Sequence, residues 1–90
     1  MSNDVIDFLI ENRVELRRII HPRIQNTLKN KQLFLPFELE DRIKESVNSE
    51  LSEHLVATFR MSKEDALVLL NEDNIQNALE ELYYDPKEYL

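Results

Sequence analysis

Residues 59–82, FRMSKEDALVLLNEDNIQNALEEL, contain the clearest folding signals in this 90-residue chain. Ser62 is a residue type preferred just before a helix, and Asp65 follows three positions later, as in a capping box. Asp73 and Gln76 repeat that arrangement a little further along. We therefore expect two short capped helices joined by a tight polar turn.

A longer helix is predicted directly before this stretch, from Pro36 to about Thr58. Proline is tolerated at a first helical position, and apolar residues then recur every four positions. Helix propensity is weakest at residues 46–49, so the helix either wraps around its neighbours or breaks there. The apolar positions of the long helix are Leu39, Ile43, Val47, Leu51 and Leu55.

The N-terminal part is predicted to hold a helix over residues 3–20. Five of the six residues at 5–10 are apolar, which is wider than one helix face. This pattern fits either a central helix or a homodimer contact, and both alternatives stay open. Because a residue before proline disfavours helix, we expect a break at His21, with Pro22 opening a short second helix to about Lys29.

Glycine is absent from the chain, although average usage would give about six. Tight hairpins and sheet bulges depend on glycine, so its absence argues against a β-rich fold. We expect an all-α fold, a small orthogonal bundle of four to five helices in one domain. Residues 1–35 would form the N-terminal helices, 36–84 the long helix and two short helices, and 85–90 a tail. Helices that end without glycine would use asparagine, for which Asn30, Asn48 and Asn71 are suitably placed, or would have no C-terminal cap.

Residue types that carry chemistry are few. There is no cysteine and there are only two histidines. Glu50 and His54 lie four apart on one helix face, but a zinc site needs three or four protein ligands. We therefore predict no catalytic residue, no metal site and no cofactor, and a protein that is not an enzyme. The acidic N-terminus does not resemble a signal peptide, and no apolar run is long enough for a membrane span, so a cytoplasmic location is expected.

Charge is unevenly distributed along the chain, whose net charge is −7. Residues 13–31 contain six basic residues and one acidic residue, whereas residues 59–90 contain three basic and eight acidic residues. A basic helical stripe can hold phosphates, but the acidic balance of the whole chain disfavours nucleic-acid binding. We expect the stripe to face the acidic C-terminal third or an acidic partner. Its residues are Arg13, Arg17, Arg18 and Arg23.

A family resemblance lies in residues 61–82. The segment MSKEDA at 61–66, Leu70, the segment NIQNA at 74–78 and Leu82 resemble the second and third helices of ubiquitin-associated-type three-helix domains. The pattern is similar to that of the nascent-polypeptide-associated complex and of the N-terminal domain of elongation factor Ts. Arg60 stands where the ubiquitin-binding version has a glycine.

The resemblance implies a partner-binding surface, with Phe59 and Met61 in the loop and Leu82 and Tyr83 at the far helix end. An alternative interpretation makes Phe59, Met61 and Leu82 ordinary core residues. A second candidate surface is the apolar LFLPF segment at 33–37, which either enters the core or docks on a partner. The residues predicted to bind there are Phe34 and Phe37.

The predicted function is that of a small acidic, non-enzymatic protein–protein interaction module of the regulator, inhibitor or adaptor type. Its partner would be another protein, with a possible homodimer through the N-terminal helix and no membrane contact. The alternatives are a nucleic-acid-associated protein that uses the basic stretch 13–31, an acidic mimic of nucleic acid, and a homodimeric structural component of a larger assembly.

Overall fold

A computed structural model describes residues 2–29 and 36–84, and every regular element in those ranges is an α-helix. This confirms the prediction of a small all-α bundle. Buried side chains from every helix join one apolar core. The helices are α1 (Ser2–Glu11), α2 (Arg13–Lys29), α3 (Pro36–Phe59), α4 (Lys63–Leu70) and α5 (Asp73–Leu82).

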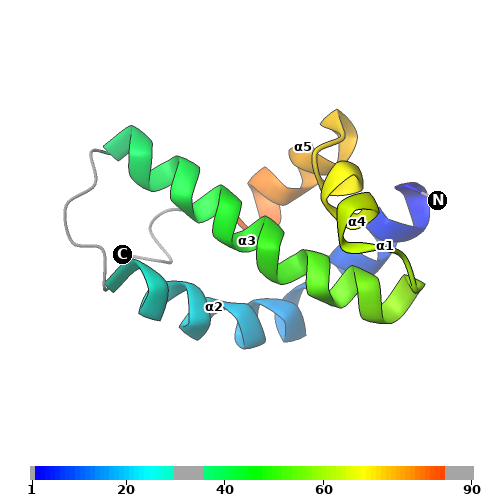
Figure 1. The fold of residues 1–90 in the computed structure, drawn as a ribbon, viewed down its shortest axis with the longest axis horizontal. Helices are drawn as coiled ribbons and strands as arrows, with labels where there is room; N and C mark the ends of the chain where they lie inside the picture. The colour runs from blue at the N-terminus through cyan, green and yellow to red at the C-terminus, as the bar shows by residue number, and fades with distance from the viewer. Residues whose placement is uncertain (1, 30–35, 85–90) are drawn as a thin grey trace.

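Helix α3 is the longest element and runs diagonally across the molecule (Figure 1). It packs against α2 along one side and against α4 near its C-terminal end, while α1 contacts α2 and α5. The predicted apolar stripe of α3 is buried at Ile43, Val47, Leu51 and Leu55. Burial of Val47 and Leu51 offsets the weak helix propensity of residues 46–49, so α3 continues through them without a break.

The break in the N-terminal segment lies at Asn12, and the predicted break at His21 is wrong. The side-chain amide of Asn12 donates to the Phe8 carbonyl at 3.0 Å, and the Arg13 guanidinium donates to the Ile10 carbonyl at 2.8 Å. The Phe8 carbonyl also accepts the backbone N–H of Asn12, so the Arg13 bond is the one that gives a partner to an otherwise open carbonyl at the end of α1. The turn allows α1 to pack against α5 and α2 to pack against α3.

Pro22 lies inside α2 instead of opening a new helix. A proline in a helix interior costs about 3 kcal/mol, because it lacks an N–H and crowds the preceding turn. Leu16, Ile20 and Ile24 lie four apart on either side of the proline and are all buried. Burial of each such side chain contributes roughly 1.5–3 kcal/mol, so together they outweigh the proline and keep α2 continuous.

The cap predicted for α4 is confirmed. Ser62 has extended backbone angles, and its hydroxyl accepts a hydrogen bond from the Asp65 N–H at 3.1 Å. The matching prediction for α5 is wrong, because the N-cap is Glu72, which makes no side-chain capping bond, and Asp73 is already helical. Gln76 instead donates from its side chain to the Leu70 carbonyl at 2.5 Å, which ties α5 back to the end of α4.

Helix ends are completed here without glycine, although not in the predicted way throughout. Asn71 ends α4 as expected, and its side chain donates to the Leu67 carbonyl at 2.7 Å. Asn48 lies inside α3, so its predicted role as a helix end is wrong. Arg60 follows α3 with φ 55°, in the left-handed region that glycine usually occupies. Asn30 lies outside the described residues.

No helix in the described ranges is both long enough and apolar enough to span a lipid bilayer.

Candidate functional site

The predicted C-terminal patch is divided between the core and the surface. Phe59 is half-buried, and its ring meets that of Phe8 edge to face at a centroid distance of 5.5 Å. Met61 and Leu82 are also half-buried and pack against the core. These three residues therefore keep part of their surface exposed while stabilising the ends of α3 and α5, and their predicted role in binding stays a prediction.

Tyr83 belongs to the core and not to an exposed patch. Its side chain has no exposed surface, and its hydroxyl donates to the Leu9 carbonyl at 2.7 Å. The Leu9 carbonyl lies in the last turn of α1, where no intrahelical donor is due. The hydroxyl of Tyr83 meets that need and ties the end of α5 to α1, which places this predicted binding residue inside the fold.

The second predicted surface cannot be located on the structure. Phe34 lies outside the described residues, and the side chain of Phe37 is not among those described, although its backbone belongs to α3. Their predicted role in partner binding stays a prediction.

The four arginines of the predicted basic stripe lie on α2 but do not act as one group. Arg18 pairs with Glu15 one turn away at 2.7 Å, on the exposed surface. Arg13 donates to the end of α1, as described above. Arg23 reaches α3, where its Nε lies 3.3 Å from Oε2 of Glu50. Oε2 of Glu50 is buried and has no partner with hydrogen-bond geometry, so this contact is an ion pair only. Arg23 thus contacts α3, whereas the expectation that the stripe faces the acidic C-terminal third or an acidic partner stays a prediction.

The other two arginines of the stripe, Arg17 and Arg18, share one surface of α2 with three further residues. Val14, Arg17, Arg18, His21 and Pro22 follow the spacing i, i+3, i+4, i+7 and i+8, which places them on one helix face. They line a shallow depression of about 410 Å³. We call these five residues the outer face of α2.

Val14 is the most exposed apolar side chain of the outer face, at 75%. Among the residues whose burial is described, the other exposed large apolar side chains are Ile10, Ile19 and Val68. Ile10 and Ile19 precede and follow Val14 along α1 and α2, whereas Val68 lies on α4. Three of these four described side chains therefore lie on the N-terminal helices α1 and α2.

Sequence reasoning finds the arginines of the outer face but misses Val14 and Pro22. Val14 does not follow the four-residue spacing of the buried residues Leu16, Ile20 and Ile24. This difference in spacing is the sequence signal that indicates an exposed valine. If Pro22 is interpreted as the start of a new helix, the predicted break at His21 separates it from Val14. A continuous helix through residues 13–29 is needed before Val14 and Pro22 share a face.

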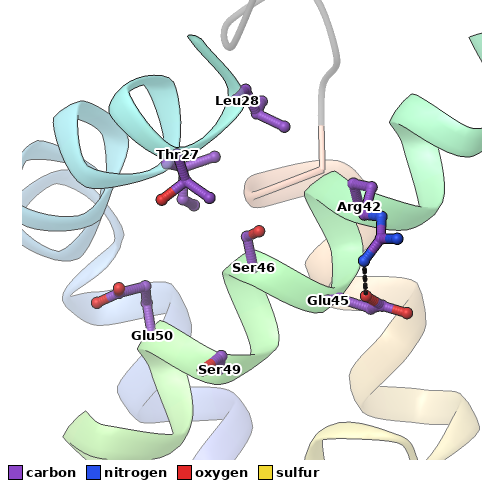
Figure 2. A pocket seen from close by; sticks show the side chains of 8 residues that line it. Thr27, Leu28, Arg42, Glu45, Ser46, Ser49 and Glu50 are labelled. Atoms are coloured by element: carbon purple, nitrogen blue, oxygen red, sulfur yellow. Dashed lines mark ion pairs between the residues drawn. The ribbon is translucent and has the colours of Figure 1, made fainter. Parts of the chain in front are cut away.

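A second depression, of about 260 Å³, lies between α2 and α3, and Figure 2 shows the side chains that line it. Thr27 and Leu28 from α2 oppose Ser46 and Glu50 from α3 (Figure 2). Several of its polar groups are engaged: Thr27 donates to the Arg23 carbonyl, Arg42 pairs with Glu45 at 3.6 Å, and Glu50 forms the ion pair with Arg23. Of these interactions, the ion pair between Arg23 and Glu50 is the one that joins α2 to α3.

A polar network joins α3 to α5 at Tyr84. The Tyr84 hydroxyl donates to Oδ1 of Asn48 at 2.5 Å, and Nε2 of Gln76 donates to the same hydroxyl at 3.2 Å. Burial raises the pKa of the Tyr84 phenol, and these two hydrogen bonds oppose that rise in part. Nζ of Lys44 lies 5.7 Å from the centre of the ring. The network is structural and lies away from the outer face of α2.

Metal ligands do not gather in the described part of the chain, where no group of three histidine or acidic side chains could hold an ion. Glu50, half of the pair considered above, is engaged with Arg23.

The comparisons with known proteins add no relative. No protein-family model matches the chain, and neither the curated proteins nor the solved structures contain a match.

Proposed function

We propose that this protein is a small non-enzymatic protein–protein interaction module, of the regulator or adaptor type, and that it binds its partner through the outer face of α2. The observation that carries the proposal is Val14, an apolar side chain 75% exposed among cationic neighbours on one helix face. Scattered exposed apolar residues are normal on protein surfaces. An exposed valine that lines a depression with Arg17, Arg18 and Pro22 is a more specific feature.

Pro22 gives independent support to the same surface. Local sequence rules and the fold disagree at this residue, because α2 continues through a proline that would ordinarily end it. Such local conflicts concentrate at functional or strained sites. Pro22 is exposed and lines the same depression as Val14, about two helical turns further along α2, so the conflict falls on the outer face and not in the core.

The composition of the outer face fits a protein partner better than a nucleic acid. Nucleic-acid surfaces rely on several cations directed at phosphates. Here Arg18 is already paired with Glu15, and Val14 and Pro22 form the apolar part of the depression. An apolar patch with a charged rim is the usual arrangement of a protein-binding surface. The resemblance of α4 and α5 to ubiquitin-associated-type domains stays a prediction and is not needed for this proposal.

The test is affinity capture from lysate of the native host with three baits: the wild-type chain, Val14→Gln and Val68→Gln. The two valines are matched controls, since their exposures are 75% and 67%. Glutamine is neutral and a good helix former, so neither helix is disturbed by charge or propensity. We expect a heterologous protein that the wild type and Val68→Gln retain and that Val14→Gln loses. If every captured protein is held equally by all three baits, the proposal fails.

A further inference from the structure

The outer surface of α4 is the chemical complement of the outer face of α2. Val68 is 67% exposed, and Asp65 and Glu64 lie three and four residues before it, both exposed. Residues three and four apart share a helix face. We call Glu64, Asp65 and Val68 the outer face of α4. It presents a valine beside two carboxylates, whereas α2 presents a valine beside two guanidinium groups.

The spacing of the two faces also matches. In an antiparallel pair of helices, a residue that follows the contact point on one helix lies opposite a residue that precedes it on the other. Arg17 and Arg18 come three and four residues after Val14, and the two carboxylates come three and four residues before Val68. With the valines in contact, the opposed charges are Arg17 with Asp65 and Arg18 with Glu64. Glu64 would share the Arg18 guanidinium with Glu15 of the same helix as Arg18.

Both valines are exposed within one chain, so these two faces do not cover each other inside the molecule. The contact requires a second chain. Other helices also carry acidic residues and uncovered apolar surface, but less of it: Ile10 of α1 is 39% exposed, and on α5 Ile75 and Leu79 are fully buried while Leu82 is half-buried. Outside α2, Val68 of α4 is the most exposed large apolar side chain among the described residues, and two carboxylates precede it at the required spacing.

We propose that the outer face of α2 binds the outer face of α4 from a second copy of this chain, with the helices antiparallel. The inference rests on the proposed function in one respect, that the outer face of α2 is a protein-binding surface. The contact joins two different surfaces, so it leads to a ring or a filament, unless a twofold axis allows two reciprocal contacts within one pair of chains.

The contact is small, so self-association is weak and sensitive to salt. Exposed ion pairs contribute at most about 1 kcal/mol each and are screened at high ionic strength. Sedimentation analysis across a wide concentration range at low salt should show the mean mass rising with concentration and falling when salt is added. Val14→Gln and Val68→Gln should each weaken the association about tenfold or more.

A charge exchange gives the decisive form of the test. Arg18→Glu brings a carboxylate against Glu64 of the second chain, and Glu64→Arg brings a guanidinium against Arg18, so each variant alone should stay monomeric. In an equal mixture, the new carboxylate of one variant can meet the new guanidinium of the other, and the mass should rise. The control is Arg42→Glu, which changes the net charge as Arg18→Glu does and removes a similar exposed pair on α3. It should associate as the wild type does.

Two results would overturn the inference: a wild-type chain that stays monomeric at every concentration, or a mixture of the exchanged variants that does not recover association. If the chain is monomeric and Val14→Gln still loses a heterologous partner, the second-copy inference fails and the proposed function stands. If the chain self-associates in this register but no heterologous protein depends on Val14, the proposed function fails and the inference stands.

Discussion

Both faces of α2 carry branched apolar residues, but these are buried on one face and exposed on the other. The face toward α3 carries Leu16, Ile20 and Ile24, which are almost entirely buried. The outer face carries Val14, which is largely exposed, and, about two helical turns further on, a proline that disfavours the helix. The buried face explains why α2 folds, and the outer face adds nothing to that explanation. Residues of α2 that contribute no burial to its folding, such as Val14, are therefore the candidates for binding a partner.

The largest expected effect separates the two faces by stability. Ile20→Ala removes a fully buried side chain and should lower the free energy of unfolding by about 2–5 kcal/mol. Val14→Ala on the outer face should change it by no more than about 0.5 kcal/mol. Urea unfolding of both variants provides the measurement. Similar losses in the two variants would mean that α2 does not have one structural and one exposed face.

Pro22→Ala should sharpen the comparison by acting in the opposite direction. Alanine restores the backbone N–H that proline lacks and removes its clash with the preceding turn. Part of this gain is offset, because alanine leaves the unfolded chain with more conformational freedom. We expect the free energy of unfolding to rise by about 1–2 kcal/mol in urea titrations. A loss of stability would show that the ring of Pro22 contributes to packing.

Tyr83→Phe tests the residue whose assignment changed most between sequence and structure. The phenol donates to the Leu9 carbonyl in the core, and its removal leaves that buried carbonyl without this donor. The free energy of unfolding should fall by about 1–2 kcal/mol. The measurement is thermal or urea unfolding. The neighbouring variant Leu82→Ala does not test the same point, because Leu82 is only half-buried. No change in stability would mean that the hydrogen bond from Tyr83 to Leu9 does not hold α5 to α1.

We expect a smaller change in the pH dependence of stability from Tyr84, whose hydroxyl donates to Asn48 of α3. Because burial raises the pKa of Tyr84, the folded chain holds the phenol proton more tightly than the unfolded chain does. This contribution to stability is fully present below the ordinary pKa of 10.0 and is lost as pH rises through the raised value. Tyr84→Phe should therefore lose less stability than the wild type between neutral and strongly alkaline pH. Equal losses, measured by unfolding at each pH, would contradict this account.

Most of the fold could be predicted from local patterns. The four-residue apolar repeat predicted α3, and the Ser62–Asp65 cap predicted the start of α4, because both signals depend on neighbours in sequence. The course of α2 could not be predicted, since tertiary burial of Ile20 and Ile24 decides whether the helix passes Pro22. The hydrogen bond of Tyr83 joins residues 74 positions apart, which no local pattern reveals.

The candidate site, too, could be predicted only in part from local sequence patterns. The sequence showed a cluster of arginines, but the direction of each one depends on its partner in the fold. Arg23 turns toward Glu50, whereas Arg17 and Arg18 line the depression beside Val14. The site could be recognised only after the continuous α2 placed these residues on one face.

Methyl NMR tests the central claim most directly. One spectrum of the chain, labelled at Val, Leu, Ile and Met methyl groups, reports on the outer face of α2 through Val14 and on the alternative patch through Met61 and Leu82. The partner to add is the heterologous protein captured by the wild-type bait. The account predicts that the signals of Val14 shift or broaden most, while those of Met61 and Leu82 stay in place. Changes at Met61 and Leu82 with Val14 unaffected would contradict it.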